Sequence, residues 1–214
     1  RGRLVVSELG GKANTGSRAA ELGVELANSG LDSKTLSTLV KEMEAGGASY
    51  EGAEASFQLL VERHRPTYVA PFTIVDFTVI VEQREGAPGR AEATVRVEVA
   101  GERLHTAADG NGPVNALDRA LRKALGAFYP QLDAVHLIDY KVRILDGASA
   151  TGAKTRVVID SVADGETWST MGVGENIISA SAAALADSLE YALRLQGGEI
   201  TRRTERDATN GHSA

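Results

Sequence analysis

The spacing of apolar residues divides the chain into a helical part and a part with alternating pattern. Up to about residue 66, apolar side chains recur every three or four positions, which is typical of short amphipathic helices. Such helices bury their apolar stripes only against each other or against a neighbouring domain. We therefore predict a helical linker subdomain at residues 1–68. Its helices are expected at 14–27, at 51–65, and from a cap at Asp32 or Ser33 to the glycine pair 46–47.

From residue 70 the pattern alternates, which predicts strands with one buried face. Three strands are followed by a helix that begins at Pro113, and the same order then occurs a second time. The first set of strands is expected at 72–81, 91–99 and 103–108. The second set is expected at 135–145, 155–162 and 166–172, with a helix at 176–195.

The two rounds are copies of one βββα unit. When Gly101 is laid on Gly165, an offset of 64 residues, eight positions up to Leu125 carry identical residues without a gap. The predicted fold class is therefore α+β, with a small helical linker subdomain followed by a duplicated βββα domain of pseudo-twofold symmetry. We place this domain at 69–196, its two units at about 70–130 and 133–196, and a disordered tail at 197–214.

Composition and charge narrow the function classes. The chain has 23 basic and 29 acidic residues, a net charge of −6, which disfavours a nucleic-acid partner. Cysteine is absent, which fits a reducing cytoplasm and excludes disulfides and thiolate metal sites. No apolar run approaches the ~20 residues that cross a bilayer, so we expect no membrane partner. Because the chain begins with Arg1 in the middle of a pattern, we expect it to be a piece of a longer protein.

Catalytic chemistry has no visible site in this sequence. The four histidines, His64, His105, His136 and His212, are not spaced as a metal-ligand pair, so no metal is expected here. No serine lies in a G-x-S-x-G motif. The segment 147–155 is similar to a phosphate-binding loop, but a strand pattern follows it where that loop requires a helix.

The two strand-to-helix junctions are the candidate binding sites. In the first, Gly110-Asn111-Gly112 precedes Pro113 and Val114, so two glycines lead into a proline at the first helical position. The free N–H groups and partial positive charge of a helix start suit a carboxylate. The second junction offers Gly174-Glu175-Asn176 at the equivalent place, and together the two could hold a zwitterion. The alternative interpretation is plain helix capping.

Several segments carry a family resemblance. The runs YEGAEASFQLLVER, HTAADGNGPVNALDRALRKAL and GVGENIISASAAALADSLEYAL resemble the C-terminal half of the α-isopropylmalate synthase and citramalate synthase family, over roughly residues 3 to 195. The most specific parts are GNGPVNALDRAL and GENII. YEGAEASFQLL and FYPQL are more similar to the citramalate-synthase-like branch.

The resemblance implies a regulatory role. Enzymes of this family condense acetyl-CoA with a 2-oxo acid on an N-terminal barrel that holds a divalent metal, and a helical linker joins the barrel to a regulatory domain. That domain forms a homodimer and binds leucine or isoleucine as a feedback inhibitor. No H-x-H metal motif occurs in this chain, so we expect the catalytic barrel, its metal and any other cofactor to be absent from it, and the chain alone to be inactive.

The resemblance also assigns residues. The first effector loop matches Gly110, Asn111, Gly112, Pro113 and Val114, and the second matches Gly174, Glu175, Asn176 and Ile177. Ala116 and Ile178 would line the pocket for a branched side chain. The alternative from another class is a dimerisation module that binds no ligand. A third interpretation, that the chain is itself an enzyme, has no paired base and nucleophile to support it.

Overall fold

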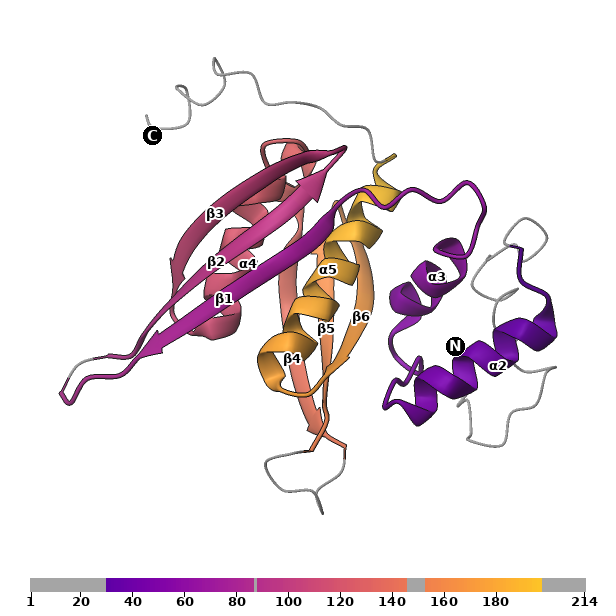
Figure 1. The fold of residues 1–214 in the computed structure, drawn as a ribbon, viewed down its shortest axis with the longest axis horizontal. Coiled ribbons are helices and arrows are strands. Elements are labelled where there is room, and N and C mark those ends of the chain that lie inside the picture. The colour runs from indigo at the N-terminus through magenta and orange to yellow at the C-terminus, as the bar shows by residue number, and fades with distance from the viewer. Residues whose placement is uncertain (1–29, 87, 146–152, 198–214) are drawn as a thin grey trace. The chain divides into compact units, whose positions relative to one another are not determined.

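In the computed structural model of the 214-residue chain, the described residues are 30–86, 88–145 and 153–197. They form an α+β fold in which a helical pair precedes two successive βββα units, as predicted (Figure 1). The predicted helix at 14–27 and the tail from 198 onward lie outside the described residues. The elements are α2 (Ser33–Ala45), α3 (Glu54–Glu62), β1 (Thr73–Glu82), β2 (Arg90–Val99), β3 (Glu102–Gly110), α4 (Pro113–Leu125), η2 (Pro130–Ala134), β4 (His136–Ile144), β5 (Thr155–Ala163), β6 (Glu166–Gly174) and α5 (Ile177–Leu195).

The chain divides into two compact units, and each is described by itself. Unit 1 consists of Arg1–Ala70, Leu137–Ser161 and Glu166–Ser188, so it contains the helical pair, β4, β6 and most of β5 and α5. Unit 2 consists of Pro71–His136, Val162–Gly165 and Leu189–Ala214, so it contains the first βββα unit.

The helical pair is defined by its caps. Of the two predicted caps for α2, the structure selects Asp32, whose Oδ1 accepts a 2.6 Å hydrogen bond from the backbone N–H of Thr35. This bond lowers the pKa of Asp32, because it favours the carboxylate. Helix α3 is shorter than the predicted 51–65 at both ends. It begins after Gly52, which has a positive φ of 75°, with Ala53 as the N-cap, and it ends at Glu62 with Arg63 as the C-cap.

In unit 2 the first sheet is antiparallel, in the order β1-β2-β3. The predicted alternation is confirmed along β2, where Ala93, Val95 and Val97 are fully buried and Glu92 and Arg96 are exposed. Helix α4 contacts all three strands, and its own apolar stripe is buried. The sheet therefore has one apolar face under α4 and one polar face.

The two hairpin turns show the duplication in the backbone. Ala100 and Gly101 have positive φ values of 49° and 83°, and Asp164 and Gly165, 64 residues later, have 52° and 84°. Two consecutive positive φ values belong to the type I′ turn, whose twist matches that of the paired strands. The 64-residue repeat found in the sequence is therefore also present in the backbone conformation of the two turns.

In unit 1 the second sheet has the strand order β4-β5-β6. Helix α5 contacts one face of this sheet and the helical pair contacts the other. On β5, the hydroxyl of Ser161 lies 2.7 Å from that of Ser188 on α5. Arg156 has the opposite parity, so it points to the other face of the sheet. Its Nε donates a 2.7 Å hydrogen bond to the carbonyl of Gly47, which follows α2. Burial lowers the pKa of Arg156.

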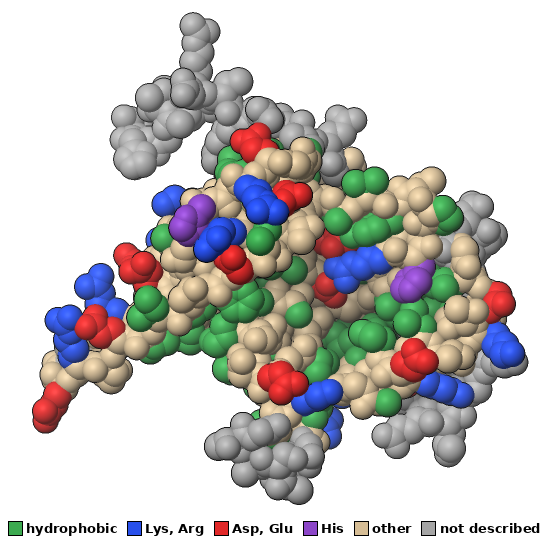
Figure 2. Space-filling view, viewed as in Figure 1, with side chains coloured by type: hydrophobic (Ala, Val, Ile, Leu, Met, Phe, Trp, Pro, Cys, Tyr) green, Lys and Arg blue, Asp and Glu red, His purple; other side chains and the backbone are tan. Residues whose placement is uncertain are grey.

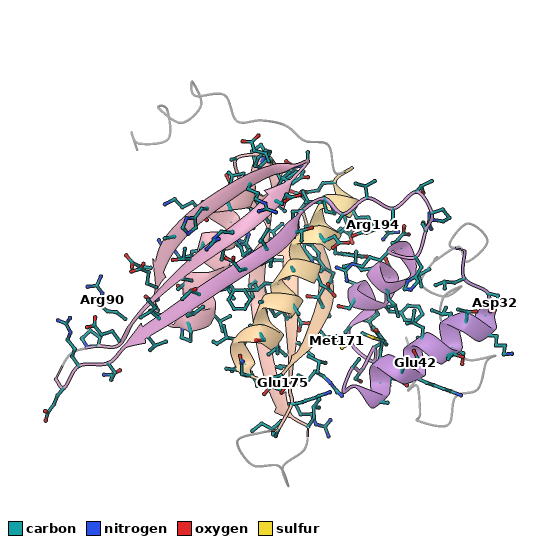
Figure 3. All side chains as sticks on the ribbon, viewed as in Figure 1. Asp32, Glu42, Arg90, Met171, Glu175 and Arg194 are labelled. Atoms are coloured by element: carbon teal, nitrogen blue, oxygen red, sulfur yellow. The ribbon has the colours of Figure 1, made fainter. Side chains whose placement is uncertain are left out.

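A hydrophobic core joins the helical pair to this sheet. The buried rings of Tyr50 and Phe57 meet edge to face with centroids 5.7 Å apart, and Met171 of β6 belongs to the same cluster (Figure 3). Burial, followed by the negative charges of Asp187 and Glu44, raises the pKa of Tyr50. Helices α2 and α3 therefore bury their apolar faces against the second sheet as well as each other.

Candidate functional site

The first junction connects β3 to α4 in unit 2. Strand β3 continues to Gly110, two residues beyond its predicted end, so this glycine is part of the strand. A Cβ atom added at Gly110 would lie 2.7 Å from the Cα of Ala116. Ala116 is fully buried. Gly110 is thus required for the close packing of β3 on α4, whether or not a ligand binds.

The second junction, in unit 1, repeats this packing. Strand β6 ends at Gly174, and a Cβ atom there would lie 2.7 Å from the backbone nitrogen of Ala180. Gly174 and Ala180 are each 64 residues beyond their counterparts in the first unit. Gly110 and Gly174, each the last residue of the third strand of its sheet, therefore allow the same close contact with the following helix.

The start of α4 is open. Its N-cap, Gly112, has an extended backbone (φ −170°, ψ 172°). Among the described residues, no side chain caps the helix, and a Cβ atom added at Gly112 would meet nothing within 4 Å. Pro113 has no N–H, so the donors of the first turn are those of Val114 and Asn115. The side chain of Asn115 accepts a 3.2 Å hydrogen bond from the backbone N–H of Asn111, which orders the loop before the helix. This helix start can accept a carboxylate.

The start of α5 is closed by its own side chain. Oδ1 of Asn176 accepts hydrogen bonds from the backbone N–H groups of Ile178 (3.0 Å) and Ser179 (2.9 Å). Asn176 thus acts as a helix cap, as the alternative interpretation holds. Glu175 is exposed at this junction (Figure 3), Ile177 is 41% exposed and Ile178 is half-buried. The second junction offers a carboxylate and apolar surface but few free donors.

The predicted site residues fall into two groups that the structure describes separately. Gly110 to Ala116 belong to unit 2, and Gly174 to Ile178 belong to unit 1. Their combination into one pocket stays a prediction. Sequence reasoning missed Asn115, although its position four residues after Asn111 was a usable signal for a loop-to-helix hydrogen bond.

The histidines take ordinary positions. His64 Nδ1 lies 2.7 Å from the carbonyl of Leu60 just after α3, and His105 and His136 are exposed on strands. Across the described ranges, no group of three or more His, Cys, Asp or Glu side chains could hold a metal ion. In the same ranges, no helix has the length and apolar character needed to cross a membrane. His212 lies outside the described residues.

Comparison with known proteins gives the family. Residues 51–193 match the model described as the LeuA allosteric (dimerisation) domain. The chain belongs to this family. The matched residues of this LeuA-type chain run from just before α3 to the last turns of α5, so they include both βββα units.

Relatives of the LeuA-type chain bear out the family resemblance. An (R)-citramalate synthase of Geobacter sulfurreducens is 48% identical over 194 residues, which cover 89% of this chain and 36% of the relative. An (R)-citramalate synthase of Aquifex aeolicus is 44% identical, with 89% of this chain and 36% of the relative covered. A 2-isopropylmalate synthase of the same organism is 29% identical, with 89% and 34% covered. The chain thus spans about a third of the length of these relatives, and the citramalate synthases have the higher identity.

Proposed function

We propose that this chain is the regulatory part of an acyltransferase of the citramalate synthase or 2-isopropylmalate synthase type. In that protein an N-terminal metal-dependent barrel condenses acetyl-CoA with a 2-oxo acid, and this chain binds the end-product amino acid and lowers the activity. Residues 1–68 are the linker to the barrel, and 69–196 are the sensor. The family membership and the relatives' names support this assignment. Coupling of this kind is typically ~1–3 kcal/mol.

One observation carries the binding proposal: the two equivalent helix starts differ in how their donors are used. Asn176 caps α5, whereas the corresponding residue of α4, Gly112, has no side chain and open space around it. If capping were the only role of these junctions, a Ser, Asp or Asn at position 112 would be favoured over glycine by a few tenths of a kcal/mol. An open start supplies N–H donors and partial positive charge for an effector carboxylate.

The remaining parts of an amino acid need an anion and an apolar surface. Glu175 is the predicted partner of the effector ammonium group, and Val114, Ile177 and Ile178 the predicted contacts of a branched side chain. Leucine and isoleucine are the two effectors we propose. They differ in where the side chain branches, so the width of the apolar contact decides between them.

Calorimetric titration of the chain with leucine, isoleucine and valine tests this proposal. Gly112→Asp is the decisive variant, because aspartate is a favoured N-cap that would occupy the α4 donors and repel a carboxylate. Its matched control is Ala127→Asp, which adds the same charge at an exposed position beyond the other end of α4. We expect binding to the unmodified chain and the control, and none to Gly112→Asp at unchanged thermal stability. No heat with any amino acid, or unchanged binding by Gly112→Asp, would contradict the proposal.

A dimerisation module is the second candidate function, and homodimer formation is compatible with the first. The family description includes dimerisation, and two edge strands expose large apolar side chains. On β1 these include Ile80 (60% exposed) and Val81 (59%), and on β4 Ile138 (56%) and Ile144 (64%). Figure 2 shows hydrophobic side chains at the surface along β1. A purely structural module would have a melting temperature that ignores added amino acids, whereas a ligand that binds the native state raises it.

A further inference from the structure

Ser56 of α3 lies where three elements of unit 1 meet. The side chain is buried, its Oγ accepts a 2.9 Å hydrogen bond from the backbone N–H of Met171 on β6, and it lies 2.7 Å from Oδ2 of Asp187 on α5. The carbonyl oxygen of Met171 is 3.5 Å away. A hydroxyl has one proton to donate, and the shorter distance and the charge of the acceptor assign that proton to Asp187.

This contact closes an open side of the sheet. Strand β6 is the last in the order β4-β5-β6, so within the described part of the chain the backbone groups on its outer side have no neighbouring strand. Ser56 provides the partner for the Met171 N–H, and α3 lies beside β6 along this edge (Figure 1). The position of α3 is therefore tied to the backbone of β6 and not only to its side chains.

Asp187 holds α3 at two points. Its Oδ1 accepts a 2.7 Å hydrogen bond from Nη2 of Arg63, the C-cap of α3, while Oδ2 faces Ser56 near the helix start. Ser56 and Arg63 are seven residues apart, about 10 Å along a helix. The Asp187 side chain is 15% exposed and that of Arg63 37%, so the bond to Ser56 is partly buried, whereas the bond to Arg63 is exposed to solvent. Asp187 of α5 thus contacts α3 near its start, at Ser56, and at its end, at Arg63.

Strand β6 and helix α5, the two elements that Ser56 contacts, are joined by the second junction. Met171 is three residues before Gly174 on β6, and Asp187 is on the helix that begins at Ile177, about 16 Å from Asn176 along its axis. If β6 or α5 shifts at the junction, the Met171 N–H and the Asp187 carboxylate that bind Ser56 shift as well. We propose that Asp187, with Ser56 and Arg63, is the positioning joint through which effector occupancy at residues 174–178 moves the linker helix α3. This inference rests on the proposed function for the effector.

Hydrogen–deuterium exchange on the chain, with and without saturating isoleucine or leucine, tests the joint. The variants are Asp187→Asn, which removes the ionic bond to Arg63, and Ser56→Ala, which removes the hydroxyl. The matched control is Asp118→Asn on α4, since Asp118 is 17% exposed and pairs with Arg122 at 2.9 Å but belongs to unit 2. Exchange of the α4 amides and circular dichroism report whether each variant still folds.

We expect both joint variants to speed exchange of the α3 amides by about tenfold without ligand, because a hydrogen bond to a charged group is lost. The control leaves α3 unchanged. Amino acid slows α3 exchange in the unmodified chain, and in Asp187→Asn it still binds, by calorimetry, but no longer affects α3. A ligand response of α3 that persists in Asp187→Asn, or α3 exchange unaffected by either variant, would overturn the joint alone. No binding to the unmodified chain would overturn the proposed function and the regulatory role with it.

Discussion

The hydroxyl of Thr170 on β6 donates a 2.9 Å hydrogen bond to the carbonyl oxygen of Ala184 on α5. Sixty-four residues earlier, the hydroxyl of Thr106 on β3 donates a 2.8 Å hydrogen bond to the carbonyl of Ala120 on α4. The same donor, acceptor and spacing occur in each unit, although most of the intervening residues differ. The duplicated unit thus keeps one polar bond between its third strand and its covering helix.

Thr170→Val tests the energetic weight of this bond. Valine keeps the shape and the β-branching of threonine but removes the hydroxyl, and position 170 is fully buried. We expect a loss of about 1 kcal/mol in the free energy of unfolding, the usual net value of such a bond. Thr106→Val, which is only partly buried, is expected to cost less. Urea denaturation measures both, and an unchanged midpoint for Thr170→Val would contradict the expectation.

The glycines of the junctions should respond to alanine in different ways. Gly110→Ala and Gly174→Ala place a methyl group within 3 Å of helix backbone atoms that cannot move aside easily, so we expect each to cost about 1–3 kcal/mol. Gly112→Ala meets nothing within 4 Å and has an extended φ, so we expect only the smaller cost of a poorer N-cap residue, about 0.5–1 kcal/mol. Thermal melts compare the three. If all three variants lost the same stability, the close strand–helix contact would not be the reason that glycine is needed at positions 110 and 174.

The Asp32 cap should give α2 a pH dependence at the acidic end. The pKa of Asp32 is lowered by the N–H of Thr35, so the carboxylate contributes stability that is complete above its unfolded value of about 3.9. This stability is lost as the pH falls through the lowered folded pKa. A ¹³C NMR titration of the carboxyl group should give a midpoint below the unfolded value. Asp32→Asn retains a cap without this titration, so its α2 amides should show less acid-dependent exchange.

Arg156 should anchor the turn after α2 to the second sheet. Its Nε and Nη2 donate to the carbonyls of Gly47 and Ala48 at 2.7 and 3.3 Å. Arg156→Met removes both bonds while keeping much of the apolar stem, and we expect a loss of about 1–2 kcal/mol. Arg156→Lys should recover only part of it, because an ammonium group cannot reproduce the fork of a guanidinium. Urea denaturation of the two variants checks the order.

The local pattern predicted most of the elements, because each carries its own signal. Alternation located the strands, and Pro113 marked the start of α4, which begins at that residue. The start of α3 was wrong by three residues, since a Gly52 turn with positive φ precedes it, and the short 3₁₀ helix Pro130–Ala134 was not predicted.

Contacts between distant residues lie beyond this kind of reasoning. Ser56 and Asp187 are 131 residues apart, and no local period indicates that they meet. Gly110 and Gly174 were singled out because each precedes a helix. The structure shows that they are needed because a Cβ atom there would clash with the backbone of Ala116 or Ala180. The sequence therefore identified the two strand-to-helix junctions, which stay a predicted site, but it did not indicate that their two helix starts are capped differently.

The exposed apolar edge of β4 should determine the oligomeric state. Ile138 is 56% exposed in an edge strand, and a homodimer that buries this remaining surface would gain about 1–1.5 kcal/mol from that side chain. Ile138→Lys adds a charge that opposes both burial and strand pairing, so we expect it to weaken the dimer in sedimentation equilibrium. Met43→Lys, at a 43% exposed position of α2, is the control and should leave the association unchanged. If Ile138→Lys associates as tightly as the unmodified chain, the edge of β4 is not part of the dimer interface.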